Sequence, residues 1–533
     1  GLLLAAATAF CAVLAGATPR VRPYYHLTAD HGGINDPNGL FYYKGVYHVF
    51  HQWHDPPEYK VDWYHQVSFD LVTWQRLPIA HVPCTSGGAV IVDGVPNLVV
   101  CPNQTSVHVA VPTNLSDPLL RDWKIEARNI VQGSYLPEVI PGYWDTSAYV
   151  DFDGTYYLVS GSCTKWGTEG TLGYCDGGNT PGNPQVMTLV SKDFQTFEYV
   201  GVPWKAKNTT YGPRTECPQM FQRGFSSKDD PSFAGLLISA PQWYQNVLFV
   251  GRLQGNGSSL DLDPFYEDGI VLDHGAVYAG QTMLDTDRDR RLFWGWVTGP
   301  VNCGPLCGNL TWKGALTLPR VLQLERTAIK SVSAPSYVVT WHVAPELAAL
   351  RVMPAVLDRP YVIPAGSRGI PVGLPPNVSG DALEMWVEGQ AEGGLGGVTI
   401  VVRATDDDKE RSWVSYSPTK GLEACTVNLL QPTQNRLPGQ PSCTAAPPLP
   451  TLTELFGGGA YQENNEDIRL RIFVDASVLE AHVEGAGGAR SVTLRVFPTR
   501  DDAMGVRLAN DGASDVTLSR LALWGMGSAY ADE

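Results

Sequence analysis

Basic residues are few in this sequence of 533 residues. Lys and Arg together number 38 against 54 Asp and Glu, which gives a net charge of -16. Such an excess of acid argues against a nucleic-acid backbone or an anionic membrane as a partner. Helical periodicity is also scarce, and beyond the N-terminal segment no apolar run approaches the roughly 20 residues that a membrane helix needs. We therefore expect a largely β protein that binds neither nucleic acid nor membrane.

The ten cysteines lack the spacing of a zinc site. Cys303 and Cys307 have no second Cys or His pair nearby, so we expect no metal and no cofactor. Cys217 belongs to a motif considered below, and Cys11 lies in the N-terminal segment. The other eight form four pairs of close sequence neighbours. We predict a disulfide within each pair, because such bonds would link loops between adjacent strands. These predicted pairs are Cys84/Cys101, Cys163/Cys175, Cys303/Cys307 and Cys425/Cys443.

The N-terminal segment, residues 2–17, reads LLLAAATAFCAVLAGA and ends in a small-x-small triplet. This pattern is typical of a signal peptide, although a buried N-terminal helix is an alternative reading. Asn-x-Ser/Thr sequons support the secretory pathway and predict N-glycans. The localisation we expect is therefore extracellular, cell wall or vacuole. The sequons lie at Asn103, Asn114, Asn208, Asn256, Asn309 and Asn377.

Short strand pairs of similar shape recur along the first 300 residues. Their spacing of roughly 50 to 90 residues is typical of a propeller with one sheet per repeat, so we predict five blades with insertions. A second element also repeats, since Ser-Phe-Asp-Leu-Val-Thr-Trp at 68–74 resembles Ser-Lys-Asp-Phe-Gln-Thr-Phe at 191–197. The alternative is a large sandwich with similar hairpins. The hairpins span residues 40–52, 89–101, 148–160, 236–251 and 283–297.

The pattern loosens around residues 328–350, and new alternating strands follow it. The predicted fold class is therefore all-β, with a five-bladed β-propeller followed by a C-terminal β-sandwich. The expected boundaries are a signal peptide at 1–17, the propeller at 20–330, a linker at 331–344 and the sandwich at 345–533.

Four acids precede predicted inner strands at similar distances. Asp36 lies in Asp-Pro-Asn-Gly, a strong turn signal, and Asp145, Glu216 and Asp273 hold comparable places. Residues just before the inner strands of a propeller lie at one mouth of its central channel, so we expect these acids to converge. Converging carboxylates repel one another unless one is protonated, which raises its pKa and equips it as a general acid. A nucleophile and an acid/base of this kind are what a glycosidase needs.

The motifs in this order resemble those of glycoside hydrolase family 32, the invertases, inulinases and fructosyltransferases. The resemblance covers nearly the whole chain and implies the same propeller and sandwich. Its N-terminal part includes Asn-Asp-Pro-Asn-Gly at 35–39, His-Gln-Trp at 51–53, the segment 63–74 and Thr-Ser-Gly-Gly-Ala at 85–89. Its later part includes Glu-Cys-Pro at 216–218, Asp-His-Gly at 273–275, Tyr-Ala at 278–279, Leu-Pro-Arg at 318–320 and Phe-Val-Asp-Ala-Ser at 473–477 with Glu480.

The resemblance implies a role for each acid. Asp36 would be the nucleophile that attacks the anomeric carbon of a β-fructofuranosyl unit, and Glu216 would be the acid/base. Asp145 would hold fructose hydroxyls and stabilise the transition state. The residues implied to bind the sugar are Asn35, Gln52, Ser86 and Asp273; Trp63 is either an apolar wall of the site or a core residue.

One departure from the family falls beside Asp145. The family usually has Arg-Asp-Pro where this chain has Trp144-Asp145-Thr146. We expect Trp144 to line the donor pocket in place of the Arg. The competing possibility is that Trp144 points into the core and Arg214, two residues before Glu216, reaches the same hydroxyls.

The function favoured by these residues is a secreted, retaining β-fructofuranosidase that hydrolyses sucrose and short fructans through a fructosyl-enzyme intermediate. A fructosyltransferase would use the same intermediate, with sucrose or a fructan as acceptor instead of water. A five-bladed arabinan hydrolase is disfavoured by the Asn-Asp-Pro-Asn-Gly segment and by the sandwich. A non-catalytic sugar-binding protein is the remaining alternative, and the presence of all three acids argues against it.

Overall fold

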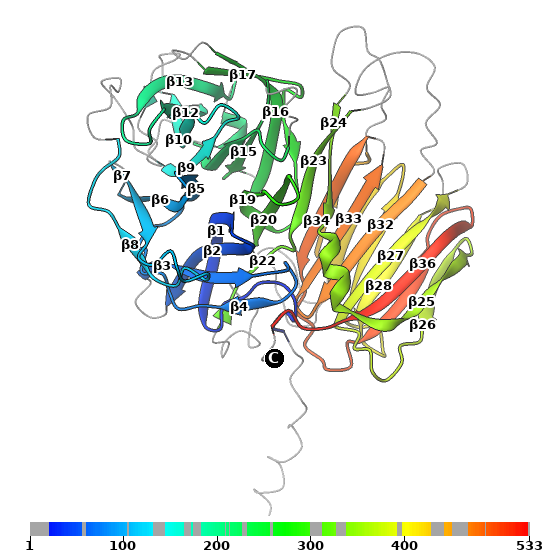
Figure 1. Ribbon diagram of the computed structural model, residues 1–533. Helices are drawn as coiled ribbons and strands as arrows, with labels where there is room; N and C mark the ends of the chain where they lie inside the picture. The colour runs from blue at the N-terminus through cyan, green and yellow to red at the C-terminus, as the bar shows by residue number, and fades with distance from the viewer. Residues whose placement is uncertain are drawn as a thin grey trace, which may run out of the picture.

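A computed structural model of the chain describes residues 21–55, 60–103, 106–131, 144–164, 172–173, 183–207, 209–212, 214–225, 232–242, 244–255, 260–298, 312–326, 337–391, 397–427, 442–449, 467–485 and 487–530. The expected signal peptide at 1–17, and with it Cys11, lies outside these ranges, as do Cys175, Cys303 and Cys307. No helix in the described ranges is long and apolar enough to cross a membrane. Figure 1 shows two bodies side by side, a ring of small sheets and a two-layer sandwich.

The described N-terminal strands form five antiparallel sheets, which confirms the five-bladed propeller. Blade one holds β1 (Gly32–Tyr43), β2 (Val46–Asp55), β3 (Lys60–Ser68) and β4 (Trp74–Arg76), and blade two holds β5 (Gly88–Val92), β6 (Val95–Asn103), β7 (Ser106–Pro112) and β8 (Trp123–Ile125). Blade three holds β9 (Trp144–Val150), β10 (Tyr156–Thr164), β12 (Pro184–Ser191) and β13 (Glu198–Lys205), with the short β11 (Leu172–Gly173).

Blade four holds β14 (Glu216–Phe221), β15 (Phe233–Ala240), β16 (Gln245–Gly255) and β17 (Leu260–Pro264), with β18 (Ile270–Val271); the short 3-10 helix η1 (Thr209–Tyr211) precedes it. Blade five holds β19 (Val277–Asp285), β20 (Arg290–Val297), β23 (Arg320–Arg326) and β24 (Tyr337–Val343), with β22 (Ala315–Leu316). The ring closes where β21 (Trp312–Lys313) pairs in parallel with β1.

The fifth blade extends past the boundary expected at residue 330. β24 lies within the expected linker at 331–344, yet it pairs with β23 along its whole length. Val338, Val339 and Trp341 are buried, and the last two belong to the core cluster of the blade, so the segment is the outer strand of this sheet. The connection to the sandwich is therefore η3 (Pro345–Leu350), a short 3-10 helix.

The repeated Ser-x-Asp segments form the same turn in blades one and three. Asp70 accepts hydrogen bonds from the N–H groups of Val72 and Thr73 at 2.8 and 2.7 Å. Asp193 accepts the equivalent bonds from Gln195 and Thr196 at 2.8 and 3.1 Å. Asp side chains commonly satisfy backbone donors two residues further on, which ends the third strand and starts the fourth. This shared turn explains the sequence repeat.

The C-terminal half is a sandwich of two antiparallel sheets. The first has the order β25 (Arg351–Ile363), β36 (Val516–Met526), β27 (Ala382–Ala391), β32 (Asp467–Asp475), β33 (Val478–Gly485) and β34 (Gly488–Arg495). The second has the order β26 (Ser367–Val372), β35 (Gly505–Asn510), β28 (Val398–Ala404), β29 (Arg411–Ser417), β30 (Gly421–Val427) and β31 (Ser442–Ala446).

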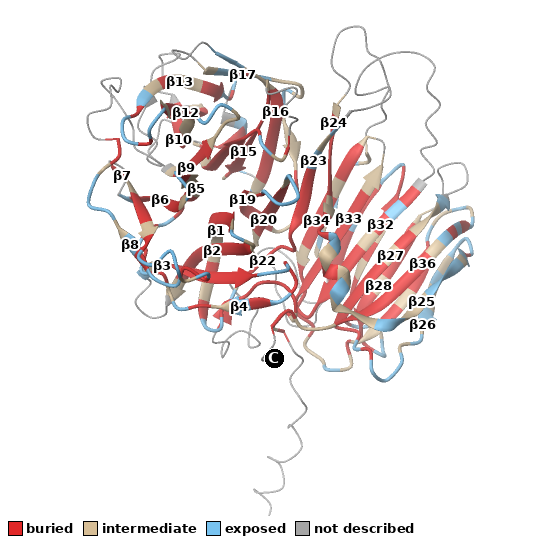
Figure 2. Ribbon diagram, in the orientation of Figure 1, coloured by how far each residue is buried: buried red, intermediate tan, exposed pale blue. Residues whose placement is uncertain are grey.

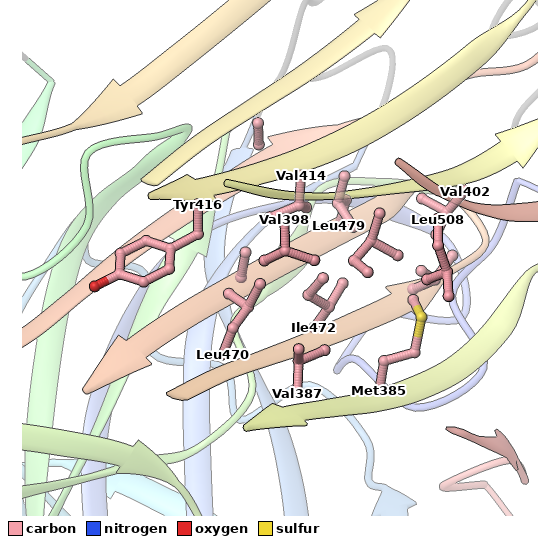
Figure 3. Packing of buried hydrophobic residues seen from close by; sticks show 14 of the residues in the cluster. Met385, Val387, Val398, Val402, Val414, Tyr416, Leu470, Ile472, Leu479 and Leu508 are labelled. Carbon is pink, nitrogen blue, oxygen red and sulfur yellow. The ribbon is translucent and has the colours of Figure 1, made fainter. Parts of the chain in front are cut away.

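The sandwich core lies between the inner faces of these two sheets. Val398 and Val402, on the same face of β28, belong to one buried cluster with Leu470 and Ile472 of β32 (Figure 3). Burying each such side chain contributes about 1.5–3 kcal/mol. Figure 2 shows that buried residues follow the strands of both bodies and continue where the propeller meets the sandwich.

The cysteines fulfil the predicted pairing only in part. Cys425 and Cys443, on the paired strands β30 and β31, form a disulfide as predicted. Cys163 is also disulfide-bonded. The prediction for Cys84 and Cys101 is wrong, because both are free thiols, although the N–H of Cys101 donates to the Cys84 sulfur at 3.1 Å. Burial raises the pKa of the Cys101 thiol to about 11 and that of Cys84 further, which disfavours the thiolate that disulfide exchange requires.

Candidate active site

β-Bulges interrupt four of the five inner strands near their N-terminal ends. The register shifts lie at 35–36 in β1, 145–146 in β9, 217–218 in β14 and 279–280 in β19. A bulge bends a strand and re-aims a side chain, and bulges are frequent beside active sites. Asp145, Cys217 and Ala279 have φ values of 48, 46 and 51°, which is the left-handed region that non-glycine residues rarely adopt. The fold therefore repeats one strained feature around the channel mouth.

The three candidate acids occupy this set of bulges. Asp36 is the second residue of the bulge in β1, and Asp145 is the first residue of the bulge in β9. Glu216 directly precedes the bulge in β14. The acids therefore come together as predicted, but they reach the mouth from three different bulge positions rather than from one shared position.

Asp36 is held by donors from the neighbouring strands. Its Oδ2 accepts hydrogen bonds from the Ser86 hydroxyl at 2.5 Å and from the Gln52 side-chain amide at 3.0 Å. The Gln52 amide also donates to the Ser86 oxygen at 2.7 Å. The structure thus places Gln52 and Ser86, both predicted sugar-binding residues, as direct partners of Asp36, and Asn35 beside it in the same bulge.

The two motifs around Asp36 and Ser86 support each other. The Asn38 side chain donates to the Thr85 carbonyl at 3.0 Å and accepts from the Gly87 N–H at 3.3 Å. A Cβ on Gly87 would lie only 2.2 Å from the Val99 carbonyl oxygen, so glycine is required there. Asn38 therefore fixes the turn that presents the Ser86 hydroxyl to Asp36.

Cys217 lies between two of the carboxylates. Its N–H donates to Asp145 Oδ2 at 3.1 Å, and its sulfur lies 3.7 Å from that oxygen and 3.5 Å from Asp36 Oδ2. Burial, and secondarily the negative charges of Glu216 and Asp36, raise the pKa of Asp145 to about 7. Burial also raises the pKa of Asp36 to about 6; the Ser86 hydrogen bond opposes this and the charge of Glu216 adds to it. The carboxylates are thus coupled in one buried site.

Glu216 has two donors of its own. The Arg214 guanidinium donates to Oε1 through Nε at 2.9 Å and through Nη2 at 2.6 Å. The Tyr278 hydroxyl donates to Oε2 at 2.6 Å. Arg214 is therefore a partner of an acid in the site. Of Trp144, the structure describes only the backbone at the start of β9, so the predicted pocket role of its indole stays a prediction.

Asp273 lies away from the three acids, and Trp63 takes the core position, which is one of its two predicted alternatives. Asp273 is fully buried where the propeller meets the sandwich, and it accepts hydrogen bonds from Arg320 Nη2 and from the Thr493 hydroxyl, each at 2.7 Å. Trp63 is also fully buried, and its indole N–H donates to the Cys84 carbonyl at 2.9 Å, so it is a core residue. The prediction for Asp273 is wrong because long-range partners use its carboxylate.

Tyr278 is the site residue that sequence reasoning missed. It directly precedes the bulge in β19, as Glu216 does in β14 and Trp144 in β9. Aligning the inner strands on the residue before each bulge brings Trp144, Glu216 and Tyr278 into one position. This alignment requires the strand register, which the sequence alone does not give.

The channel between the inner strands also holds a cavity of about 470 Å³, with both apolar and polar lining residues. It is lined by Leu40, Ile91, Ala148, Met220 and Met283, one from each inner strand. These residues follow the bulges along their strands, so the cavity lies further along the channel than the acids.

Comparison with known proteins agrees with this architecture. Residues 26–335 match the family model described as "Glycosyl hydrolases family 32 N-terminal domain", and residues 362–525 match "Glycosyl hydrolases family 32 C terminal". The chain is 26% identical over 566 residues to a rice β-fructofuranosidase, insoluble isoenzyme 3 (Oryza sativa subsp. indica), covering 95% of this chain and 91% of the relative. It is 25% identical over 568 residues to a fructan 6-exohydrolase from Beta vulgaris, covering 95% and 86%. The crystal structure of fructan 1-exohydrolase IIa from Cichorium intybus has a similar fold, with a TM-score of 0.73, 20% identity and coverage of 96% of this chain and 98% of that one.

Proposed function

The chain belongs to glycoside hydrolase family 32, and we propose that it is a secreted, retaining β-fructofuranosidase that hydrolyses sucrose and short fructans. The observation that carries this proposal is the meeting of Asp36, Asp145 and Glu216 around Cys217 at one end of the channel. The names of the relatives add support, since they include a β-fructofuranosidase and a fructan exohydrolase.

In the first step, a carboxylate oxygen of Asp36 attacks the anomeric carbon of the fructosyl unit, and the bond from that carbon to the leaving oxygen breaks. Ser86 and Gln52 both donate to Oδ2, so we assign the attack to Oδ1. Glu216 gives its proton to the leaving oxygen, and a covalent fructosyl-enzyme ester forms.

In the second step, Glu216 takes a proton from water, and the resulting nucleophile attacks the same carbon. The ester bond to Asp36 breaks, fructose leaves and both acids return to their starting forms. Asp145, whose pKa of about 7 allows both protonation states near neutrality, holds fructose hydroxyls as a hydrogen-bond donor or acceptor. Asn35 is a further sugar contact in this proposal.

Arg214 orients Glu216 in this mechanism. Its two hydrogen bonds to Oε1, together with the Tyr278 hydroxyl on Oε2, fix the orientation of the acid/base. The Arg214 side chain is 24% exposed, so it also reaches the solvent-facing part of the site, where a sugar hydroxyl would arrive. Arg214 and Trp144 are thus the two candidates for the sugar contacts that the Arg of the family's Arg-Asp-Pro segment would make.

Incubation with sucrose tests the proposal, with glucose and fructose measured separately. Equal release of the two sugars is the result expected of a hydrolase, whereas glucose in excess of fructose would identify a fructosyltransferase. Absence of both products in the wild-type protein would overturn both enzymatic readings. An Asp36→Asn variant of the same preparation is the matched control, because it removes the nucleophile and keeps the size of the side chain.

We also place the protein in the secretory pathway. Asn114 and Asn377 are exposed within their sequons, and Cys425 and Cys443 are disulfide-bonded, which suits an oxidising compartment. Enzymatic removal of N-glycans from protein expressed in a eukaryotic host should increase its gel mobility. Unchanged mobility, together with unmodified Asn114 and Asn377 peptides by mass spectrometry, would contradict this placement.

A further inference from the structure

Tyr244 is an exposed aromatic residue beside the candidate acid/base. It ends the turn between β15 and β16, and 60% of its surface is accessible. Its ring centroid lies 4.8 Å from that of Tyr278, with the two ring planes inclined by 43°. Tyr278 in turn donates to Glu216 Oε2 at 2.6 Å. A continuous path of contacts therefore leads from Glu216 through Tyr278 to an open aromatic face.

The backbone of Tyr244 also has an unusual conformation. Its φ of 52° lies in the left-handed region, where a bulky side chain is uncommon and a glycine or asparagine would be easier to accommodate. Four other large apolar side chains are exposed in the described ranges: Phe69, Leu115, Met353 and Val362. Tyr244 is distinguished from them by its contact with a partner of a candidate catalytic group.

We propose that Tyr244 is the platform on which the sugar of the leaving group, and of an incoming acceptor, rests. This inference rests on the proposed function. Glu216 must lie within hydrogen-bond distance of the leaving oxygen, and in this proposal the leaving sugar extends from Glu216 on the side of Oε2, where Tyr278 and Tyr244 lie. An exposed aromatic ring offers a pyranose or furanose an apolar face without fixing the pattern of its hydroxyls. Tyr244 thereby sets how well a sugar competes with water for the fructosyl-enzyme intermediate.

The choice of donor separates the sugar-contacting role of Tyr244 from the proton-transfer role of Glu216. Sucrose and methyl β-fructofuranoside both have a poor leaving group that Glu216 must protonate, but only sucrose has a leaving sugar. Loss of the platform should therefore lower kcat/KM for sucrose alone. Loss of a residue that positions Glu216 should lower kcat/KM for both donors.

The experiment compares kcat/KM for these two donors in the wild type and in Tyr244→Ala. Aromatic contacts contribute enough to predict a loss of about three- to tenfold for sucrose, carried mainly by KM, with no change for the methyl fructoside. Tyr244→Phe should retain the wild-type value for both donors, since the ring remains. Phe69→Ala, which removes a similarly exposed ring from the end of blade one, is the matched control. At high sucrose, Tyr244→Ala should also form less transfer product per fructosyl unit cleaved.

Four outcomes overturn the platform. An unchanged kcat/KM for sucrose in Tyr244→Ala shows that no sugar rests there, and an equal loss for both donors shows that Tyr244 acts through Glu216 instead. A wild type that cleaves the methyl fructoside but not sucrose also overturns the platform while leaving the proposed fructosidase chemistry intact. A wild type that cleaves neither donor overturns the proposed function together with this inference.

Discussion

The backbone N–H of Cys217 donates a 3.1 Å hydrogen bond to Asp145 Oδ2, so blade four holds a carboxylate that blade three presents. Both residues have a positive φ at the first position of a bulge. Backbone strain of this kind costs about 1–3 kcal/mol for each residue and persists where surrounding structure enforces it. Here the enforced geometry brings the carboxylates of Asp36 and Asp145 close together around Cys217 in a buried site. Their burial has consequences for activity and for its dependence on pH.

The first prediction concerns the nucleophile. Asp36→Asn should reduce sucrose turnover by about a thousandfold or more, because an amide does not form the fructosyl ester. The fold should survive, since Asn38 and Gly87 maintain the turn around Ser86. Circular dichroism and the thermal midpoint check that the variant is folded. A folded variant with turnover near the wild-type value would contradict the assignment.

The second prediction concerns pH. Burial raises the pKa of Asp36 to about 6, and the nucleophile acts as the carboxylate, so kcat/KM should fall as the pH falls below about 6. When Glu216 is ionised, its negative charge adds to this shift, and Glu216→Gln removes that charge. In Glu216→Gln, a fructosyl donor whose leaving group needs no protonation should therefore keep its activity to lower pH than in the wild type. An acid limb at the same pH in both proteins would argue against coupling of the two carboxylates.

The third prediction concerns Arg214. Arg214→Ala should lower kcat/KM for sucrose about 10- to 100-fold, because it removes charge-assisted hydrogen bonds to Glu216. Arg214→Lys should recover only part of this loss, since a single ammonium group lacks the two-donor fork. Trp144→Ala is the comparison: a normal fold with altered kcat/KM would support the pocket role of Trp144, whereas unfolding would place its indole in the core.

Local patterns account for the part of the fold that the sequence predicts correctly. Hairpins and Ser-x-Asp turns are made by residues close together in the chain, so their repetition along the sequence is enough to indicate propeller blades. The assignment of Asp273 fails for the opposite reason, since its partners Arg320 and Thr493 lie 47 and 220 residues away. The sequence does not give the strand register either. The bulges that bring Tyr278 to Glu216 can be identified only once the pairing of the strands is known.

The fourth prediction follows from the corrected place of Asp273. Arg320 Nη2 donates to Asp273 at 2.7 Å and to Glu480 at 3.0 Å, and all three groups are fully buried. Arg320→Met would leave two carboxylates without their shared cation, so the free energy of unfolding should fall by about 3–5 kcal/mol. Asp273→Asn should also destabilise the protein in urea while leaving KM for sucrose unchanged. If Asp273→Asn instead raises KM for sucrose and leaves stability unchanged, Asp273 would be a sugar-binding residue after all.

The last prediction concerns His26, which lies in the same interface between propeller and sandwich. Its Nδ1 lies 2.7 Å from Asp475 Oδ2 and its Nε2 lies 2.9 Å from Glu480 Oε1. Burial lowers the pKa of this imidazole, but the hydrogen bonds and negative charges of Asp475 and Glu480 outweigh burial and raise the pKa from 6.5 to about 9.

Because the pKa of His26 is higher in the folded than in the unfolded chain, the imidazolium stabilises the folded state. That stabilisation is fully present below pH 6.5 and is lost as the pH rises through about 9; a shift of this size contributes on the order of 3 kcal/mol. Urea unfolding midpoints should therefore fall across this range in the wild type. His26→Gln should be less stable below pH 6.5 and should lose most of the decline, because glutamine does not titrate. If the urea midpoint of His26→Gln declines as steeply with rising pH as that of the wild type, other groups cause the pH dependence. The His26 imidazolium would then not stabilise the contact of the propeller with β32 and β33.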